Sequence, residues 1–127
     1  METILKYIRT IILATILFLF SRETYAQKET EVFIPLGKSP GVSGKYSIIG
    51  RVETVNASDS TITIRQDASI KTIKITAATE IYLDRSKQKL TSRKCSFAEC
   101  KPGLMTEVKY KDNKPDSSIE WLKVQPE

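Results

Sequence analysis

Two cysteines and a complete absence of histidine limit the chemistry that this chain of 127 residues can carry. Histidine is the commonest metal ligand and the usual general base, so both roles would fall to other residues. Cys95 and Cys100 have four residues between them, whereas redox pairs are usually spaced Cys-x-x-Cys and structural zinc sites need four ligands. The sequence has no second pair of cysteines or histidines. We therefore predict no metal site and no cofactor.

The residues that could replace histidine in catalysis are poorly placed to hold a geometry. Ser39 and Ser43 have lysines nearby that could act as a base, but they lie in a glycine-rich segment, which cannot fix a nucleophile without support. Carboxylates such as Glu53 and Asp59 come from a strand and a turn, with no sign of a shared cleft. The sequence predicts that the protein is not an enzyme and has no catalytic residue.

A run of cations is the clearest candidate binding feature. Five cations occur within ten residues, shortly after Tyr82, and the set consists of Arg85, Lys87, Lys89, Arg93 and Lys94. Charge beside an aromatic side chain is how small barrels of the OB type bind single strands or sugars. The run predicts an anion-binding loop, and the alternative is a solvated loop with no ligand.

The first 26 residues have the three parts of a secretory signal peptide. Lys6 and Arg9 supply a basic start, residues 11–20 are apolar, and a polar segment then ends at Ala26. We predict cleavage near Ala26 and a periplasmic or secreted mature protein. The alternative is a retained anchor, but a membrane span needs about 20 apolar residues. We expect no stable membrane span after cleavage.

Export would affect both the oxidation state of the cysteines and the net charge of the chain. Exported proteins form disulfides, so we predict a bond between Cys95 and Cys100, with free thiols or a metal or redox pair as alternatives. Cleavage removes three of the 20 basic residues and two of the 15 acidic ones, and the mature net charge is then +4. A mildly basic protein favours anionic partners such as polysaccharide, lipid headgroups or nucleic acid.

The mature chain divides into an irregular arm and one β-rich domain. Residues 27–45 contain a short apolar stretch, residues 32–36, followed by three glycines and a proline in eight residues, which marks irregular backbone. From residue 46 the apolar side chains alternate, which is typical of strands. The expected strands are residues 46–55, 61–65, 70–76, 80–83, 106–110 and 119–124.

These short strands predict an all-β domain over residues 46–125, a small antiparallel OB-like barrel of five to six strands. Gly50 interrupts the first strand and predicts a bulge or a sharp bend. Residues 96–100 predict a single helical turn, which Pro102 and Gly103 would end. A signal-peptide helix and the arm precede this domain.

The strand sequences resemble a known group of domains. Residues 50–55 (GRVETV) and 61–64 (TITI) look like the opening hairpin of small exported OB-like barrels of bacteria. Residues 97–103 (FAECKPG), 108–110 (VKY) and 119–124 (IEWLKV) look like the closing half of these barrels. The resemblance implies an OB-like fold over residues 46–125, and many such domains have no assigned function.

The periplasmic copper- and silver-binding chaperone barrel is a relative with an assigned function. That family binds its ion through a histidine, a Met-x-Met pair and a capping tryptophan. The present chain has no histidine, and Met105 is the single methionine of the mature chain. We expect Trp121 in the core rather than over a metal. Without soft ligands, Cu(I) binding has no physical basis here. The resemblance therefore implies the OB-like fold but not the metal-binding activity.

The sequence therefore predicts a non-enzymatic, exported binding or interaction module of unidentified partner, an envelope protein or a polyanion. The runner-up is a structural envelope protein that docks through the apolar stretch of its arm, because exposed apolar segments either fold back or bind something. A metal carrier is a third hypothesis and would depend on Cys95 and Cys100.

Overall fold

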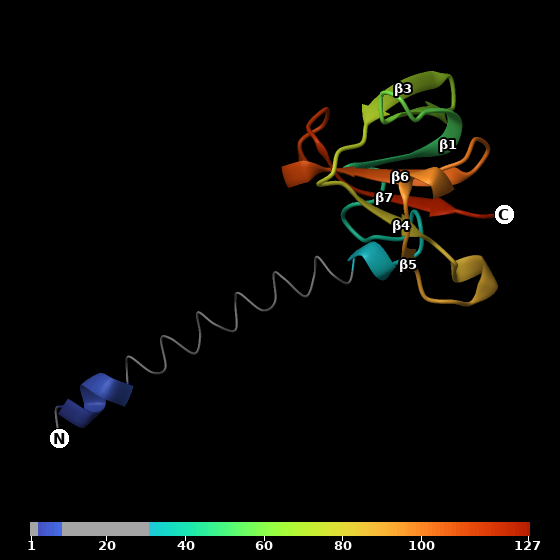
Figure 1. The fold of residues 1–127 in the computed structure, drawn as a ribbon. Coiled ribbons are helices and arrows are strands. Elements are labelled where there is room, and N and C mark those ends of the chain that lie inside the picture. The colour runs from blue at the N-terminus through green and yellow to red at the C-terminus, as the bar shows by residue number, and fades with distance from the viewer. Residues whose placement is uncertain (1–2, 9–30) are drawn as a thin grey trace. The chain divides into compact units, whose positions relative to one another are not determined.

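The structure, a computed structural model, describes residues 3–8 and 31–127 (Figure 1). The chain divides into two compact units, Met1–Glu31 and Val32–Glu127. Of the first unit, residues 3–8 are helical, and most of the predicted signal peptide, with its cleavage site at Ala26, lies outside the described residues. Within the described ranges, no helix is long and apolar enough to cross a membrane.

The second unit is a single seven-stranded sheet with short helical turns, so the predicted all-β class is confirmed (Figure 1). The strands run in the order β3-β2-β1-β6-β7-β4-β5 across the sheet. They are β1 (Ser47–Asn56), β2 (Thr61–Gln66), β3 (Ser69–Lys74), β4 (Glu80–Leu83), β5 (Arg93–Lys94), β6 (Met105–Tyr110) and β7 (Ile119–Gln125). Since this unit contains the whole sheet, it has the elements of an independent domain.

The structure corrects the predicted barrel in three respects. It has seven strands instead of five or six, because β5, a strand of two residues, forms within the basic loop and pairs with β4. The sheet is mixed, since β4 runs parallel to β7. It is also open, because β3 pairs with β2 alone and residues 75–79 then carry the chain across to β4. The sheet thus curls around one core without closing.

The predicted helical turn is confirmed. A 3₁₀ turn, η2 (Phe97–Glu99), follows Ser96, and the Ser96 and Glu99 side chains cap each other's backbone N–H groups in a capping box. Two further 3₁₀ turns were not predicted, η1 (Ser86–Gln88) in the basic loop and η3 (Lys111–Asn113) after β6.

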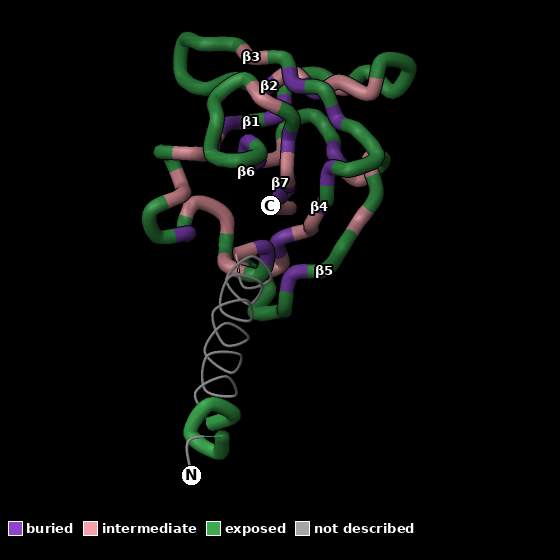
Figure 2. Tube along the Cα trace, turned by 90° about the vertical axis from the view of Figure 1, so that its left-hand side faces the viewer, coloured by how far each residue is buried: buried purple, intermediate pink, exposed green. Residues whose placement is uncertain are grey.

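The core is one cluster of buried apolar residues, mainly from β1, β2, β3, β4, β6 and β7, and Figure 2 shows where the buried residues lie along the chain. Ile62, Leu122 and Val124 are fully buried there. Gly50 allows β1 to approach β2 closely, because a Cβ at this position would lie 2.5 Å from the carbonyl oxygen of Arg65. The irregularity in the ladder itself comes slightly later, between Val52 and Thr54. Gly50 is therefore a point of close approach rather than the bulge.

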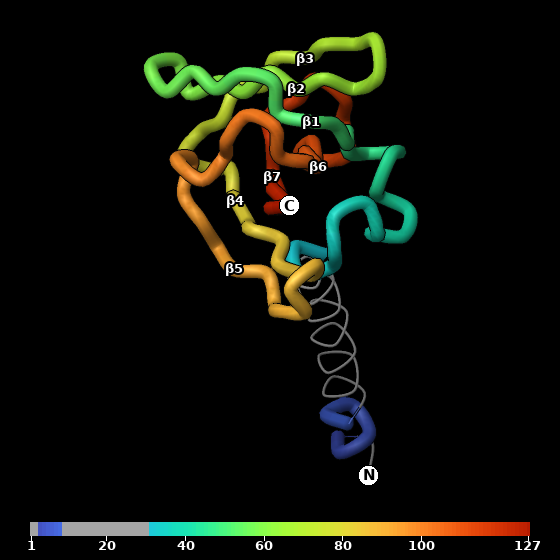
Figure 3. Tube along the Cα trace, turned by 90° about the vertical axis from the view of Figure 1, so that its right-hand side faces the viewer, coloured from blue at the N-terminus to red at the C-terminus, as the bar shows by residue number. Residues whose placement is uncertain are grey.

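Over β6 and β7 the other face of the sheet is covered by the arm, residues 32–45, which precedes β1 (Figure 3). The strand partners Glu107 and Lys123 lie on this face and are both fully buried. Trp121 is buried as predicted, but it lies on the same side as Lys123, whose ammonium nitrogen is 4.5 Å from the ring centroid. The domain therefore has an apolar core on one face and a covered polar layer on the other.

Candidate functional site

Asp84, at the end of β4, joins the arm to the basic loop. Its Oδ2 accepts hydrogen bonds from the backbone N–H of Leu36 at 2.8 Å and from Nε2 of Gln125 at 3.0 Å. Its Oδ1 accepts from the backbone N–H of Ser86 at 2.8 Å. Burial by itself would raise the pKa of Asp84, but these hydrogen bonds outweigh it and lower the pKa. One ionised carboxylate thus fixes the start of the arm against the start of the loop.

Glu107 and Lys123 hold the rest of the arm. The Glu107 carboxylate accepts from the backbone N–H of Gly37 at 2.9 Å, from the Ser43 hydroxyl at 2.6 Å and from the Ser47 hydroxyl at 2.7 Å. Nζ of Lys123 donates to the carbonyl of Ile34 at 2.7 Å. The side chains of Glu107 and Lys123, both buried, thus attach the arm to β6 and β7 by hydrogen bonds.

Three of the four residues that were considered for catalysis have structural partners, whereas the Ser39 hydroxyl is buried without a hydrogen-bond partner among the described residues. The Ser43 hydroxyl is engaged by Glu107, and Glu53 forms an ion pair with Arg65 at 2.6 Å on the surface. Asp59 accepts a hydrogen bond from the Asn56 side chain within its turn. Ser39 and Ser43 do lie together, since the backbone N–H of Ser39 donates to the Ser43 hydroxyl at 3.0 Å, but the two carboxylates have the separate partners given above. In the described part of the chain, no group of three or more acidic or cysteine side chains could hold a metal ion.

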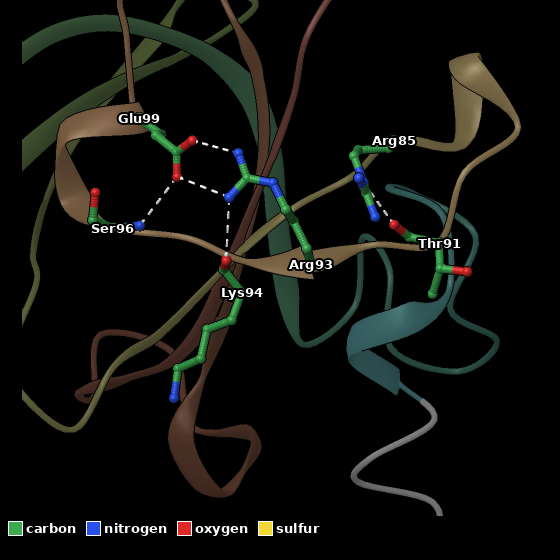
Figure 4. A network of polar contacts seen from close by, with 6 residues as sticks. All are labelled: Arg85, Thr91, Arg93, Lys94, Ser96 and Glu99. Carbon is green, nitrogen blue, oxygen red and sulfur yellow. Dashed lines mark hydrogen bonds and ion pairs between the residues drawn. The ribbon is translucent and has the colours of Figure 1, made fainter.

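Two of the five cations of the basic loop are used to hold the loop itself (Figure 4). Arg93 forms a two-point ion pair with Glu99, with Nη2 2.6 Å from Oε1 and Nη1 3.4 Å from Oε2. This contact lowers the pKa of Glu99 and raises that of Arg93. Nε of Arg85 donates to the carbonyl of Thr91 at 2.7 Å and closes the loop across its base. These two residues therefore position the loop.

The other three cations remain available to a ligand. Lys87, Lys89 and Lys94 are exposed, and nothing in the described residues pairs with their ammonium groups. Lys89 has a left-handed backbone (φ 58) at the end of η1. The loop therefore changes direction at Lys89, between Lys87 and Lys94. Of the five cations that the sequence indicated, three therefore have ammonium groups without a partner in the described residues.

Two exposed apolar side chains, Phe33 and Leu90, belong to the arm and to the loop, and the sequence did not indicate that they would stay exposed. Phe33 packs edge-on against Tyr82, with ring centroids 6.2 Å apart. Tyr82 is the strand partner of Lys94, so their side chains share one face of the β4–β5 ladder. Leu90, in the loop, is 52% exposed. We refer to Phe33, Lys87, Lys89, Leu90 and Lys94 as the arm–loop surface.

The cysteines flank η2 as free thiols, and the structure does not show the predicted disulfide. Cys100 is buried in the core and Cys95 is half-buried. Burial raises the pKa of Cys95 to about 12 and that of Cys100 to about 11. Thiols with such pKa values stay protonated near neutral pH, so they are weak nucleophiles and weak metal ligands.

A pocket of about 330 Å³ lies away from the basic loop, between β3 and the segment that leads into β7. Lys71 and Asp116 form an ion pair on its wall, and Tyr110 contributes to its lining. The pKa of Lys71 is raised, chiefly by its hydrogen bond to Asp116. Lys71 and Asp116 therefore partner each other on the wall of this pocket, whereas the Tyr110 hydroxyl is buried without a hydrogen-bond partner among the described residues.

No known protein family, no curated protein and no solved structure matches this chain.

Proposed function

We propose that this chain is an exported, non-enzymatic binding module that binds polyanions through the loop of residues 85–94. The observation that carries the proposal is that the arginines of the loop hold its shape while its lysines stay exposed. Arg85 and Arg93 are held by Thr91 and Glu99, while Lys87, Lys89 and Lys94 present unpaired ammonium groups to solvent. A loop that is already held in shape loses less conformational entropy on binding.

A polyanion suits this arrangement better than a small ligand does. The lysine side chains are exposed rather than gathered in a cleft, and each phosphate or sulfate of a polymer can be met by one flexible ammonium group. The mild positive charge of the chain adds long-range attraction. Tyr82 contributes less than the sequence suggested, since Phe33 already packs against its ring.

The OB-like assignment and the export route belong to the same proposal. OB domains are partly open barrels, and the curled, open sheet around a single core is consistent with that architecture. Export with cleavage near Ala26 would yield a periplasmic or secreted chain that begins at Gln27 and retains the whole second unit.

The test is the salt dependence of binding to a heparin-like polyanion by the chain 27–127. If three lysines each neutralise one anionic group, the affinity should fall steeply with salt, with a logarithmic slope of about −2 to −3. An affinity that does not change with salt would contradict the proposal. So would turnover of a hydrolase substrate that is abolished by a single side-chain change, because the protein would then be an enzyme.

A structural envelope protein that docks through its arm is the second candidate. Phe33 favours it, because this side chain of the apolar stretch is still 50% exposed after the arm has folded onto the sheet. The hydrogen bonds of Leu36 and Gly37 to buried carboxylates argue that most of the arm is occupied within its own domain.

A further inference from the structure

The arm–loop surface is the place where the chain enters the domain. Val32 is buried, and the next residue, Phe33, is half exposed. Leu36 and Ser86 bind the same carboxylate, that of Asp84, so the beginning of the arm and the beginning of the loop are fixed side by side. Figures 1 and 3 both show the arm's first turn next to the segment that links β4 and β5.

This surface combines exposed apolar groups with unpaired cations. In residues 31–127 the large apolar side chains that remain exposed are Phe33, Ile70 and Leu90. Two of these three belong to the arm–loop surface, together with Lys87, Lys89 and Lys94. A soluble polyanion needs only the lysines. The exposed phenyl and leucyl groups suit a partner that is anionic at its surface and apolar just beneath it.

We infer that the arm–loop surface docks on an anionic lipid bilayer, with the lysines at the headgroups and Phe33 and Leu90 in the boundary to the acyl chains. The inference rests on the proposed function, and it names lipid as the source of the anions. Interfacial protein segments use this combination of apolar and basic side chains, and a lysine near an anionic membrane surface contributes about five-fold in affinity.

The sequence that precedes the domain is consistent with docking on a bilayer. Phe33 is the second residue of the domain unit, which starts at Val32, and residues 11–20 are the apolar run of the predicted signal. Ten residues, 21–30, connect that run to the arm and can span at most about 35 Å. While the run is held in a bilayer, the domain therefore cannot lie far from the lipid surface.

The experiment is co-sedimentation of the chain 27–127 with vesicles of phosphatidylcholine alone and of phosphatidylcholine with phosphatidylglycerol. We expect binding to the anionic vesicles only. Exchanging Lys87, Lys89 and Lys94 for serine should weaken this binding by about 100-fold. The charge-matched control exchanges Lys101, Lys111 and Lys114, which are exposed elsewhere, and should have a much smaller effect.

The apolar variants separate lipid from a soluble polyanion. The double change Phe33→Ser and Leu90→Ser should weaken vesicle binding by about ten-fold or more and leave heparin binding unchanged. The control is Ile70→Ser, at a site of similar exposure on β3, which should leave both unchanged. Heparin binding without vesicle binding, or vesicle binding unaffected by the double change, would overturn the inference while the proposed function stands. Binding to neither partner at low salt would overturn both.

Discussion

The carboxylate of Glu107 accepts a hydrogen bond at 2.6 Å from the hydroxyl of Ser43, a residue 64 positions earlier in the chain. This contact joins the middle of the arm to the middle of β6 and lies in a layer where Glu107 and Lys123 are inaccessible to solvent. The arm is therefore part of the fold, and it sets where Phe33 lies relative to the basic loop. The arm–loop surface depends on this buried polar layer.

Removing the Glu107 carboxylate should be costly. Glu107→Ala leaves the Gly37 N–H and the Ser43 and Ser47 hydroxyls without their acceptor, and we expect a loss of about 2–4 kcal/mol in the free energy of unfolding. Urea denaturation at pH 7 measures it. Glu53→Ala, which breaks the surface pair with Arg65, is the control and should cost about 0–1 kcal/mol. Equal losses in both variants would contradict a structural role for the covered layer.

Deleting the arm should destabilise the domain. A chain that starts at Lys45 loses the hydrogen bonds that the arm makes with Asp84, Glu107 and Lys123, so its denaturation midpoint should fall well below that of the chain 27–127. A chain that starts at Glu31 is the control and should match the longer chain. If the chain from Lys45 keeps its stability but loses association with an envelope protein, the arm is a docking segment, as the second candidate function requires.

Much of the fold was predictable, because alternation of apolar residues is a local signal. The predicted strand 80–83 coincides with β4 (Glu80–Leu83), and the prediction 61–65 is one residue shorter than β2 (Thr61–Gln66). The parallel pairing of β4 with β7 was missed, because it depends on where residues 75–79 carry the chain. β5 was missed because its two residues are both cationic and carry no alternation.

The covered polar layer could not be read from the sequence for a physical reason. Glu107 and Lys123 occupy polar positions of alternating strands, and such positions normally face water. Here the arm lies over them, and nothing local to either strand records this. The basic loop was found from its charge, but its internal pairs were not, since the contact of Arg93 with Glu99 depends on the η2 turn.

The contribution of Asp84 should disappear in acid. Its pKa is lowered in the folded state, so its stabilisation is complete above the unfolded value of about 4 and is lost as the pH falls through the folded pKa. Asp84→Asn should therefore reduce the free energy of unfolding by about 1–3 kcal/mol at pH 7. Below the folded pKa the difference between the two proteins should shrink. Denaturation curves of both proteins, measured from pH 7 down into acid, test this prediction. A difference in the free energy of unfolding that grows on acidification would contradict the stabilising role of ionised Asp84.

The state of the cysteines depends on export. We expect protein recovered from an oxidising compartment to contain a Cys95–Cys100 disulfide, so thiol counting after unfolding without reductant should find no free thiol. The reduced, folded protein should be alkylated much more slowly at pH 7 than the unfolded chain, because burial raises the pKa values to about 12 and about 11. Two thiols in the exported, unreduced protein would reject the disulfide.

The central claim is that the exposed lysines of the basic loop bind a polyanion, and a comparison of two charge-matched triple variants tests it most directly. Heparin affinity at low salt is measured for the chain 27–127, for the serine triple variant at Lys87, Lys89 and Lys94, and for that at Lys101, Lys111 and Lys114. Both variants remove three charges and should keep their stability within about 0.5 kcal/mol per site. The account predicts that the loop variant loses about ten-fold or more in affinity and most of its salt dependence, while the control stays within about three-fold. Equal affinities in both variants, or no binding by the unchanged chain, would contradict the claim.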